Sequence, residues 1–133
     1  MSKLSNRAAA LGIMSALALG TIASAPAYAK GGGAKVTHPG ACSARTVSKL
    51  AVKHDDGRIE TQFEVDSNRV GQRWNVVIKD NGVKVFSGAR TTTAPSGSFE
   101  VNRRIANRAG TDTIVASAKN PATGESCVAR ASI

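Results

Sequence analysis

The chain has 133 residues, with 18 Lys and Arg against nine Asp and Glu, and aromatic residues make up only 4% of it. A chain of this length is expected to form one domain with a modest core, which excludes a multidomain architecture. The basic excess points to anionic partners or to solubility, and the scarcity of aromatic rings argues against a module that stacks nucleic-acid bases.

The first 29 residues predict a secretory signal peptide. Lys3 and Arg7 give it a positive start, an uncharged apolar stretch follows over residues 8–22, and small residues lead to Ala29, where we expect cleavage. The apolar stretch is too short to cross about 30 Å of hydrocarbon comfortably, which argues against a membrane anchor. The predicted secreted, extracellular chain, residues 30–133, loses only two cations with the signal and has a net charge of +7.

A Gly-rich segment over residues 30–41 predicts a flexible leader, followed by a folded domain over residues 42–133. The two cysteines, Cys42 and Cys127, lie near the two ends of this domain. In an exported protein such a pair predicts a disulfide. Two cysteines alone cannot complete the ligand shell of a structural zinc ion, so we expect no metal there.

From residue 46 onward, short runs that alternate apolar and polar residues are separated by turn residues, which is typical of β-strands. The clearest run is the second, in which Ile59, Phe63 and Val65 alternate with acidic and amide residues. We expect seven strands, over residues 46–54, 58–66, 73–79, 83–90, 98–107, 111–119 and 126–133.

The sequence Asp80-Asn81-Gly82 predicts a two-residue type I′ hairpin between the third and fourth strands. With that turn, Ile78 is expected to face Val85 on the core side, and Val77 to pair with Phe86 on the other face. A bulge in the fourth strand would instead move Phe86 into the core.

Seven short strands with regular turns predict an all-β, immunoglobulin-like sandwich. Trp74 alternates with Val76 and Ile78, so we expect it to be buried in the core. A disulfide between the first and last strands differs from the antibody pattern, which makes the fibronectin type III-like class the closer comparison.

Several segments together resemble small secreted proteins of high-GC Gram-positive bacteria. They are Trp74-Asn75-Val76 through Asp80-Asn81-Gly82, Ala94 to Phe99, Asn107 to Gly110, and Thr123 to Cys127. The resemblance covers most of residues 42–133 and implies an immunoglobulin-like or fibronectin type III-like sandwich outside the cell. It brings no catalytic residues or cofactor with it.

The sequence offers little acid–base or metal chemistry. The segment His54-Asp55-Asp56 places its three side chains consecutively before a glycine, which predicts a hairpin tip rather than a site. A serine-hydrolase triad is not expected, because His38 lies in the leader and no Gly-x-Ser-x-Gly motif is present. Glu60, Glu64 and Asp66 lie on the solvent side of one strand, where they are expected to pair with neighbouring Lys or Arg. We therefore predict no enzyme, metal or cofactor.

A carbohydrate-binding platform would need exposed aromatic rings. Of the four in the predicted mature domain, Trp74, Phe63 and Phe99 stand at inward positions, which leaves Phe86 as the one candidate for an exposed ring. A single ring is a poor platform for a sugar.

The basic excess gives the one candidate binding site. Several arginines stand in or near two loops and a strand of the central region, and we predict that they attract polyanions. Solubility alone would also explain them, and we do not expect specific nucleic-acid binding, because the interleaved aromatic rings are missing. The candidate residues are Arg69, Arg73, Arg103, Arg104 and Arg108.

The sequence therefore predicts a secreted, non-catalytic binding domain. Its partner would be an extracellular protein, reached through a sheet edge or face, or an anionic cell-wall polymer, reached through the arginines. The alternative is an inhibitor of an extracellular enzyme such as a protease, which would use the loop from Thr91 to Gly97.

Overall fold

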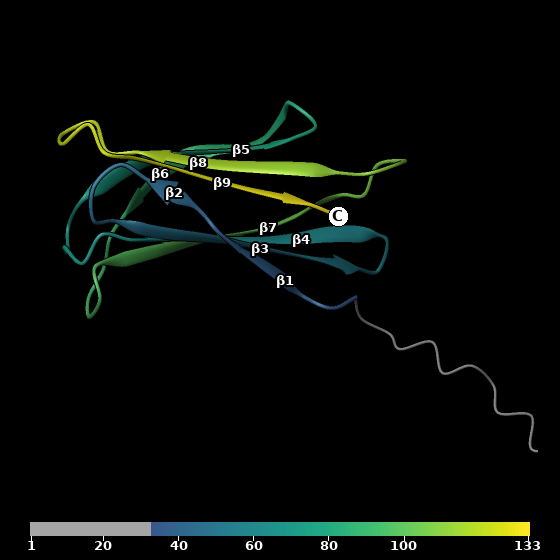
Figure 1. Cartoon of the computed structure of the whole chain (residues 1–133), viewed down its shortest axis with the longest axis horizontal. Helices are drawn as coiled ribbons and strands as arrows, with labels where there is room; N and C mark the ends of the chain where they lie inside the picture. The colour runs from purple at the N-terminus through teal and green to yellow at the C-terminus, as the bar shows by residue number, and fades with distance from the viewer. Residues whose placement is uncertain (1–32) are drawn as a thin grey trace, which may run out of the picture.

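The computed structural model describes residues 33–133, which form two antiparallel β-sheets packed face to face (Figure 1). The predicted signal peptide, its cleavage site after Ala29 and the first residues of the predicted leader lie outside the described residues. Within the described part there is no helix long and apolar enough to cross a membrane. The all-β class predicted from the sequence is confirmed.

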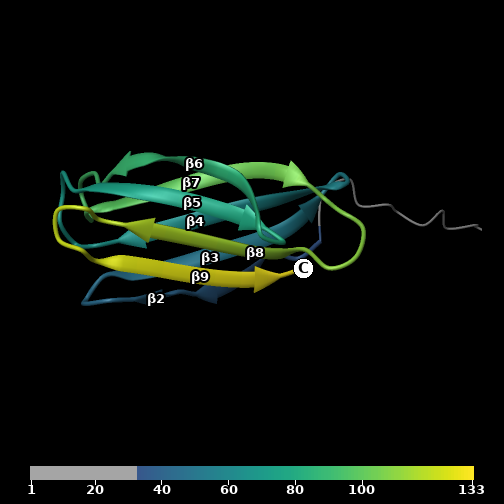
Figure 2. The same ribbon diagram turned by 90° about the horizontal axis from the view of Figure 1, so that it is seen from above.

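One sheet has four strands in the order β1-β3-β4-β7, and the other has five in the order β2-β9-β8-β5-β6. Figure 2, seen from above, shows the five-stranded sheet lying over the other. The strands are β1 (Val36–Pro39), β2 (Ala41–Cys42), β3 (Val47–Asp55), β4 (Arg58–Asp66), β5 (Arg73–Asp80), β6 (Val83–Thr91), β7 (Ser98–Ala106), β8 (Thr113–Lys119) and β9 (Ser126–Ser132).

The expectation of seven strands is wrong, because there are two more: β1 lies within the predicted flexible leader, and β2 spans the boundary between the leader and the predicted domain. β1 pairs with β3 in one sheet, and β2 pairs with β9 in the other. Gly40 stands between them, where a Cβ atom would overlap the Ser48 hydroxyl and lie only 3.0 Å from the Val128 carbonyl oxygen, so a larger residue would have to displace its neighbours at this crossing. Strands this short show almost no periodic pattern in the sequence. Their pairing partners also lie far away along the chain.

The connection after β3 is a hairpin, so β3 and β4 are neighbours in the same sheet. If β1 and β2 are counted together as the first strand, β3 and β4 are the second and third. In a constant-type immunoglobulin domain the second and third strands lie in different sheets. The hairpin turns at Asp56-Gly57, whose φ angles of 47° and 73° match the tight turn that the sequence predicts here. The chain therefore forms a two-sheet sandwich in which the connection between β3 and β4 differs from that of a constant-type immunoglobulin domain.

The core lies between the two sheets and comes from alternate residues of nearly every long strand. Trp74 is fully buried, as predicted, and its ring lies 6.4 Å from that of Phe99 on the opposite sheet. Burial of this apolar area is the main force holding the sheets together. The largest fully buried apolar side chains are Trp74, Phe63, Leu50, Ile59, Ile78 and Ile114.

The register of the β5–β6 hairpin corrects one prediction. Lys79 stands opposite Lys84, but Ile78 stands opposite Phe86, because a bulge makes Val85 an extra residue on β6. The predicted pairs of Ile78 with Val85 and of Val77 with Phe86 are therefore wrong. The bulge buries the larger phenylalanine ring, which is only 8% exposed, in place of a valine.

Cys42 and Cys127 form the predicted disulfide. The two residues stand directly opposite each other in the β2–β9 pair, so the bridge fastens the edge strand of the five-stranded sheet to its neighbour. It links the first and last parts of the domain.

Candidate polyanion-binding surface

The sandwich has two ends. We call the loop end the one formed by the loops at 43–46, 67–72, 92–97 and 120–125, and the hairpin end the one formed by the turns at 56–57 and 81–82 and the loop at 107–112. Each long strand runs from one of these ends to the other.

The structure does not bring the five predicted arginines into one cluster. Arg69 and Arg73 lie at the loop end, and Arg108 lies in the loop at the hairpin end. Arg103 and Arg104 lie between them on β7, where consecutive residues point to opposite faces.

Three of the five have carboxylate partners. Arg69 lies 3.7 Å from Glu125, and Arg104 lies 3.2 Å from Asp55. The Nε atom of Arg108 lies 3.5 Å from Asp80, which is 1% exposed. These contacts neutralise part of the positive charge on which the predicted cluster was based.

Arg73 belongs to a different group, on the outer face of the five-stranded sheet. Residues paired across a sheet point to the same side, so the register determines which side chains share this face. We call it the basic face, because its strands contribute five exposed cations and, among the described residues, no Asp or Glu. Its cations are Arg73, Lys79, Lys84, Lys119 and Arg130.

The cations of the basic face form two bands. Near the hairpin end, Lys84 stands directly opposite Lys79, and the same row continues through Val115 to Arg130. With about 4.8 Å between strands, this row spans about 15 Å. The second band lies nearer the loop end and consists of Lys119 and Arg73. Lys119 stands opposite Asn75, about 14 Å from Lys79 along the strand, and Arg73 is about 20 Å from it, at about 3.4 Å per residue.

The row between these bands is flat and carries small side chains. It contains Val77, Ser117 and Val128, which are paired in register across three strands. No bulky side chain stands in this row, so an extended chain could lie across it and reach both bands of cations.

Like charges directly opposite each other on a sheet destabilise it. Lys79 and Lys84 are such a pair, and no carboxylate of the described residues lies within 4.0 Å of either. A bound anion would remove this repulsion.

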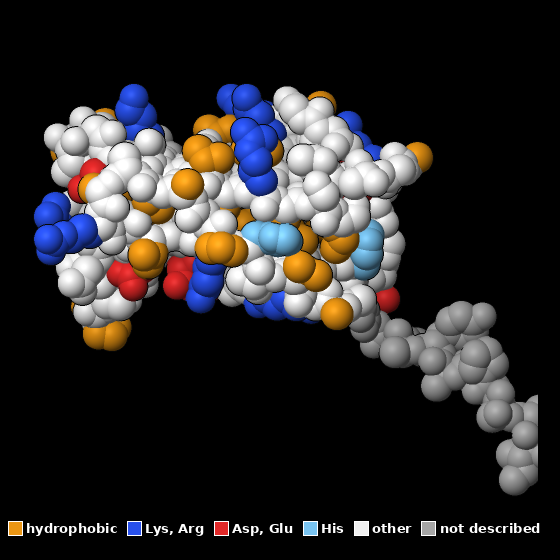
Figure 3. Space-filling view, in the orientation of Figure 1, with side chains coloured by type: hydrophobic (Ala, Val, Ile, Leu, Met, Phe, Trp, Pro, Cys, Tyr) orange, Lys and Arg blue, Asp and Glu red, His pale blue; other side chains and the backbone are white. Residues whose placement is uncertain are grey.

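The outer face of the four-stranded sheet is different, because its charges are matched. Lys49 lies 3.3 Å from Glu64, and Lys53 lies 3.1 Å from Glu60, which confirms the predicted pairing of these glutamates with the neighbouring strand. In the space-filling view, Asp and Glu appear beside Lys and Arg along the lower border, whereas Lys and Arg project alone from the upper border (Figure 3).

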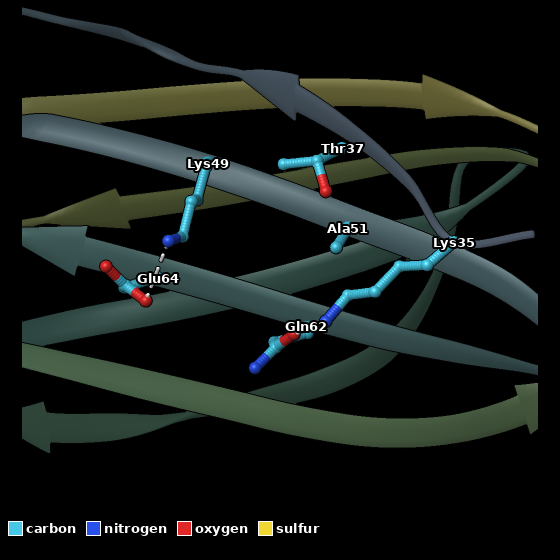
Figure 4. A pocket seen from close by; sticks show the side chains of 6 residues that line it. All are labelled: Lys35, Thr37, Lys49, Ala51, Gln62 and Glu64. Carbon is cyan, nitrogen blue, oxygen red and sulfur yellow. Dashed lines mark hydrogen bonds and ion pairs between the residues drawn. The ribbon is translucent and has the colours of Figure 1, made fainter.

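A shallow pocket opens on this matched face, between β1, β3 and β4 (Figure 4). Lys35 donates a hydrogen bond to the Gln62 side chain, and Lys49 pairs with Glu64 inside the pocket. Its charged groups already have partners in the protein, so it offers an anion little. The lining residues are Lys35, Thr37, Lys49, Ala51, Gln62 and Glu64.

A second pocket lies at the loop end, and Glu125 is one of the residues that line it. The Thr46 hydroxyl donates a hydrogen bond of 2.5 Å to Glu125, and Arg69 approaches the same carboxylate. The pocket is lined by Ala44, Arg45, Thr46, Ser67, Arg69 and Glu125.

The loop from Thr91 to Gly97, the candidate inhibitory loop, is fastened to the neighbouring loop at 67–72. Thr92 is 1% exposed, and its backbone N–H donates to the carbonyl of Gln72. Its hydroxyl lies 2.5 Å from the carbonyl of Arg69. Thr91 and the tip, residues 93–96, are exposed, whereas Thr92 and Gly97 are buried.

The structure disperses the acid–base candidates as well. His54 meets the Asn107 side chain at 3.4 Å, Asp55 pairs with Arg104, and Asp56 lies in the turn. Within residues 33–133, no three His, Cys, Asp or Glu side chains are close enough together to hold a metal ion.

Two carboxyl groups that the sequence did not single out are buried at the hairpin end. Asp80 and Asp112 are 1% and 0% exposed. Burial raises the pKa of Asp80 above its usual 3.8, and the neighbouring Asp112 raises it further, against the opposing effect of Arg108. The signal for Asp80 was its inward position on β5, two residues after Ile78.

Sequence reasoning also missed four of the five cations of the basic face. Lys79, Lys119 and Arg130 stand at outward positions of alternating strands, and no acidic residue shares those positions. That pattern is visible in the sequence once the strands are assigned, but the order of the strands in the sheet is needed to see that the residues meet.

No protein-family model matches the chain, and neither a curated protein nor a solved structure shows significant similarity to it.

Proposed function

We propose that the protein is a secreted, non-catalytic domain that binds an anionic extracellular polymer, such as a cell-wall polymer, across the basic face. The observation that supports this function is the imbalance of that face: five exposed cations and no carboxylate on the outward positions of β5, β6, β8 and β9. An elongated anion is the partner with complementary charge over such a length.

The arrangement favours a charge-based partner over one recognised by stacking. The aromatic rings that a sugar or a nucleic-acid base would stack on are in the core, with Phe63 and Trp74 fully buried and Phe86 and Phe99 less than one tenth exposed. Contacts between lysine or arginine and a polyanion release counterions, so binding should weaken steeply as salt rises.

The finer fold assignment is also part of this proposal. In one sheet of immunoglobulin variable domains, the last two strands of the chain lie beside two strands from its middle. The order β9-β8-β5-β6 has the same arrangement, with β9 and β8 as the last two strands and β5 and β6 as the middle ones. We propose an immunoglobulin-like sandwich in which this sheet presents the ligand-binding surface and the β3–β4 hairpin occupies the other sheet.

The test compares two triple variants that lower the net charge equally. One carries Lys79→Ser, Lys84→Ser and Arg130→Ser on the basic face, and the control carries Lys49→Ser, Lys53→Ser and Arg58→Ser on the matched face. Each contact to a polyanion contributes about 0.7–0.9 to the slope of log affinity against log salt, so the first variant should lose about 2–3 in slope with polyphosphate as the probe.

The control should keep a slope close to that of the unmodified protein, because its cations lie on the opposite side of the sandwich. Equal losses from both variants would reduce the basic face to general charge and contradict the proposal. Absence of any polyphosphate binding at low salt would contradict it as well.

A further inference from the structure

The open side of the sandwich between β6 and β7 carries a second cationic feature, separate from the basic face. Each of these strands is the edge strand of its own sheet, and the two lie side by side (Figure 2). Their inward-facing side chains therefore meet across the gap between the sheets.

Two arginines occupy inward positions on these edges. On β6, Arg90 stands opposite Trp74 and so points to the core side of the sheet. On β7, Arg103 alternates with the buried residues Val101 and Ile105. Because β6 and β7 are edge strands, these inward positions reach solvent: Arg103 is exposed and Arg90 is partly buried.

Both guanidinium groups lie against the ring of Phe86. The Cζ atom of Arg103 lies 4.4 Å from the ring centroid, and that of Arg90 lies 5.1 Å from it. The ring crosses over Gly88, where a Cβ atom would lie only 3.0 Å from the phenyl Cζ. Gly88 thus provides the space in which the ring sits, and the ring positions the two cations.

Neither arginine has a carboxylate partner in the described part of the chain. Arg90 donates one hydrogen bond, of 2.8 Å, to the carbonyl of Ala89, and the five ion pairs of residues 33–133 involve neither Arg90 nor Arg103. β6 carries no acidic residue at all. Since both Cζ atoms lie close to one ring centroid, the two guanidinium groups are no more than about 9.5 Å apart and repel each other. An anion held between them would turn this repulsion into attraction.

We propose that Arg90, Phe86 and Arg103 form a binding site for a phosphate group. The planar guanidinium presents paired N–H donors that match two oxygens of an oxyanion, so two such groups can hold a phosphate by bidentate hydrogen bonds. The site goes beyond the proposed polymer binding, because it lies at the β6–β7 edge rather than on the outer face and takes a single group.

Inward-pointing charges on edge strands also discourage pairing with a strand of another molecule. Preventing such pairing requires only a positive charge, which lysine also has. Bidentate binding of phosphate requires the paired N–H donors that only arginine has. The double substitution Arg90→Lys with Arg103→Lys therefore separates the two explanations. A matched control is Arg45→Lys with Arg58→Lys, at positions outside both surfaces.

The experiment titrates the full secreted protein with inorganic phosphate at low chloride and follows the Nε–Hε NMR signals of its arginines. In the unmodified protein we expect saturable shifts of these side-chain signals confined to Arg90 and Arg103. The affinity of all three proteins is compared by the backbone amide shifts of β6 and β7, and it should be about tenfold weaker in the double lysine variant and unchanged in the control. Absence of saturable shifts, or equal weakening in both variants, would overturn the site.

Two further titrations define the ligand. Acetate should bind more weakly than phosphate, because it carries one negative charge and two oxygens, whereas phosphate at neutral pH carries about −1.5 and has more oxygens to accept hydrogen bonds. Equal affinity would overturn the assignment to phosphate. Short polyphosphate should shift the same two arginine signals if the site recognises a phosphate group that is part of a polymer. Shifts of these signals with inorganic phosphate alone would place the site's ligand among small phosphates, which still supports it.

Discussion

The two outer faces of the sandwich are built from the same kinds of strand, yet their charges are organised in opposite ways. On the four-stranded sheet, each lysine of β3 that points outward meets a glutamate of β4. On the five-stranded sheet, Lys79 meets Lys84 and the remaining cations have no carboxylate nearby. Either arrangement would keep the protein soluble, so solubility does not explain why the cations of one face have no carboxylate partners. The unmatched face is therefore the one where we propose that a ligand binds.

The largest expected effect comes from removing the disulfide, which lies entirely within the five-stranded sheet. Replacing Cys42 and Cys127 by serine should lower the free energy of unfolding by about 4–5 kcal/mol, because a loop of 85 residues is no longer closed in the unfolded chain. Urea unfolding measures this loss.

The same variant tests whether the basic face is independent of β2. None of the five cations stands on β2, so the salt dependence of polyphosphate binding should be unchanged under conditions where the variant is folded. A smaller salt slope would show that the edge strand takes part in the site.

The seven longer strands could be predicted from the sequence because their signals are local, and the disulfide could be predicted because the chain has only two cysteines. The alternation in β4 and the Asn81-Gly82 turn need no knowledge of distant residues. The bulge in β6 is one of two alternatives that the sequence leaves open, and local signals do not choose between them, because the choice depends on burying Phe86 against the opposite sheet.

The candidate site could be predicted only in part, for a related reason. Arg103 and Arg104 were grouped because they are adjacent in the chain, but adjacent residues of a strand point to opposite faces. Lys84 and Arg130 lie far apart in the sequence and meet in one row only through the strand order β9-β8-β5-β6. The charge of the sequence alone suggests an anionic partner, but only the structure identifies the surface on which the unpaired cations lie together.

A smaller effect concerns Asp80, which lies behind Lys79 on the inner side of β5. Because its pKa is raised in the folded protein, the protonated form stabilises the fold below pH 3.8, and that contribution is lost as pH rises through the folded pKa. Asp80→Asn should therefore raise the free energy of unfolding at neutral pH and flatten its decrease between acid and neutral pH.

Urea unfolding at several pH values measures this effect, with Asp56→Asn in the exposed turn as the control. The control should leave the pH dependence unchanged. A neutral-pH loss of stability in Asp80→Asn would mean that the ion pair with Arg108 outweighs the cost of burying the carboxylate.

The smallest expected effect is also the most direct test of the comparison between the faces. Lys84→Glu replaces a repulsive pair by an attractive one and should raise the free energy of unfolding by about 0.2–1 kcal/mol. It should weaken polyphosphate binding at the same time. Lys53→Glu, opposite Glu60, should do the reverse on the matched face, with lower stability and little change in binding. Stability changes of the same sign in both variants would contradict the proposed difference.

The crossing of the chain from β1 to β2 at Gly40 also determines how the protein would respond to mechanical force. A pull on Val36 and Ile133, near the two ends of the described chain, passes through β1, the Cys42–Cys127 bridge and β9 (Figure 1). Residues 43–126 lie outside this short path, because the covalent bridge bypasses them. The strands that carry Lys79, Lys84 and Lys119 therefore lie outside the path of the force, whereas Arg130 stands on β9 within it. Tension on the two ends of the described chain would act directly on only one of the five cations of the basic face.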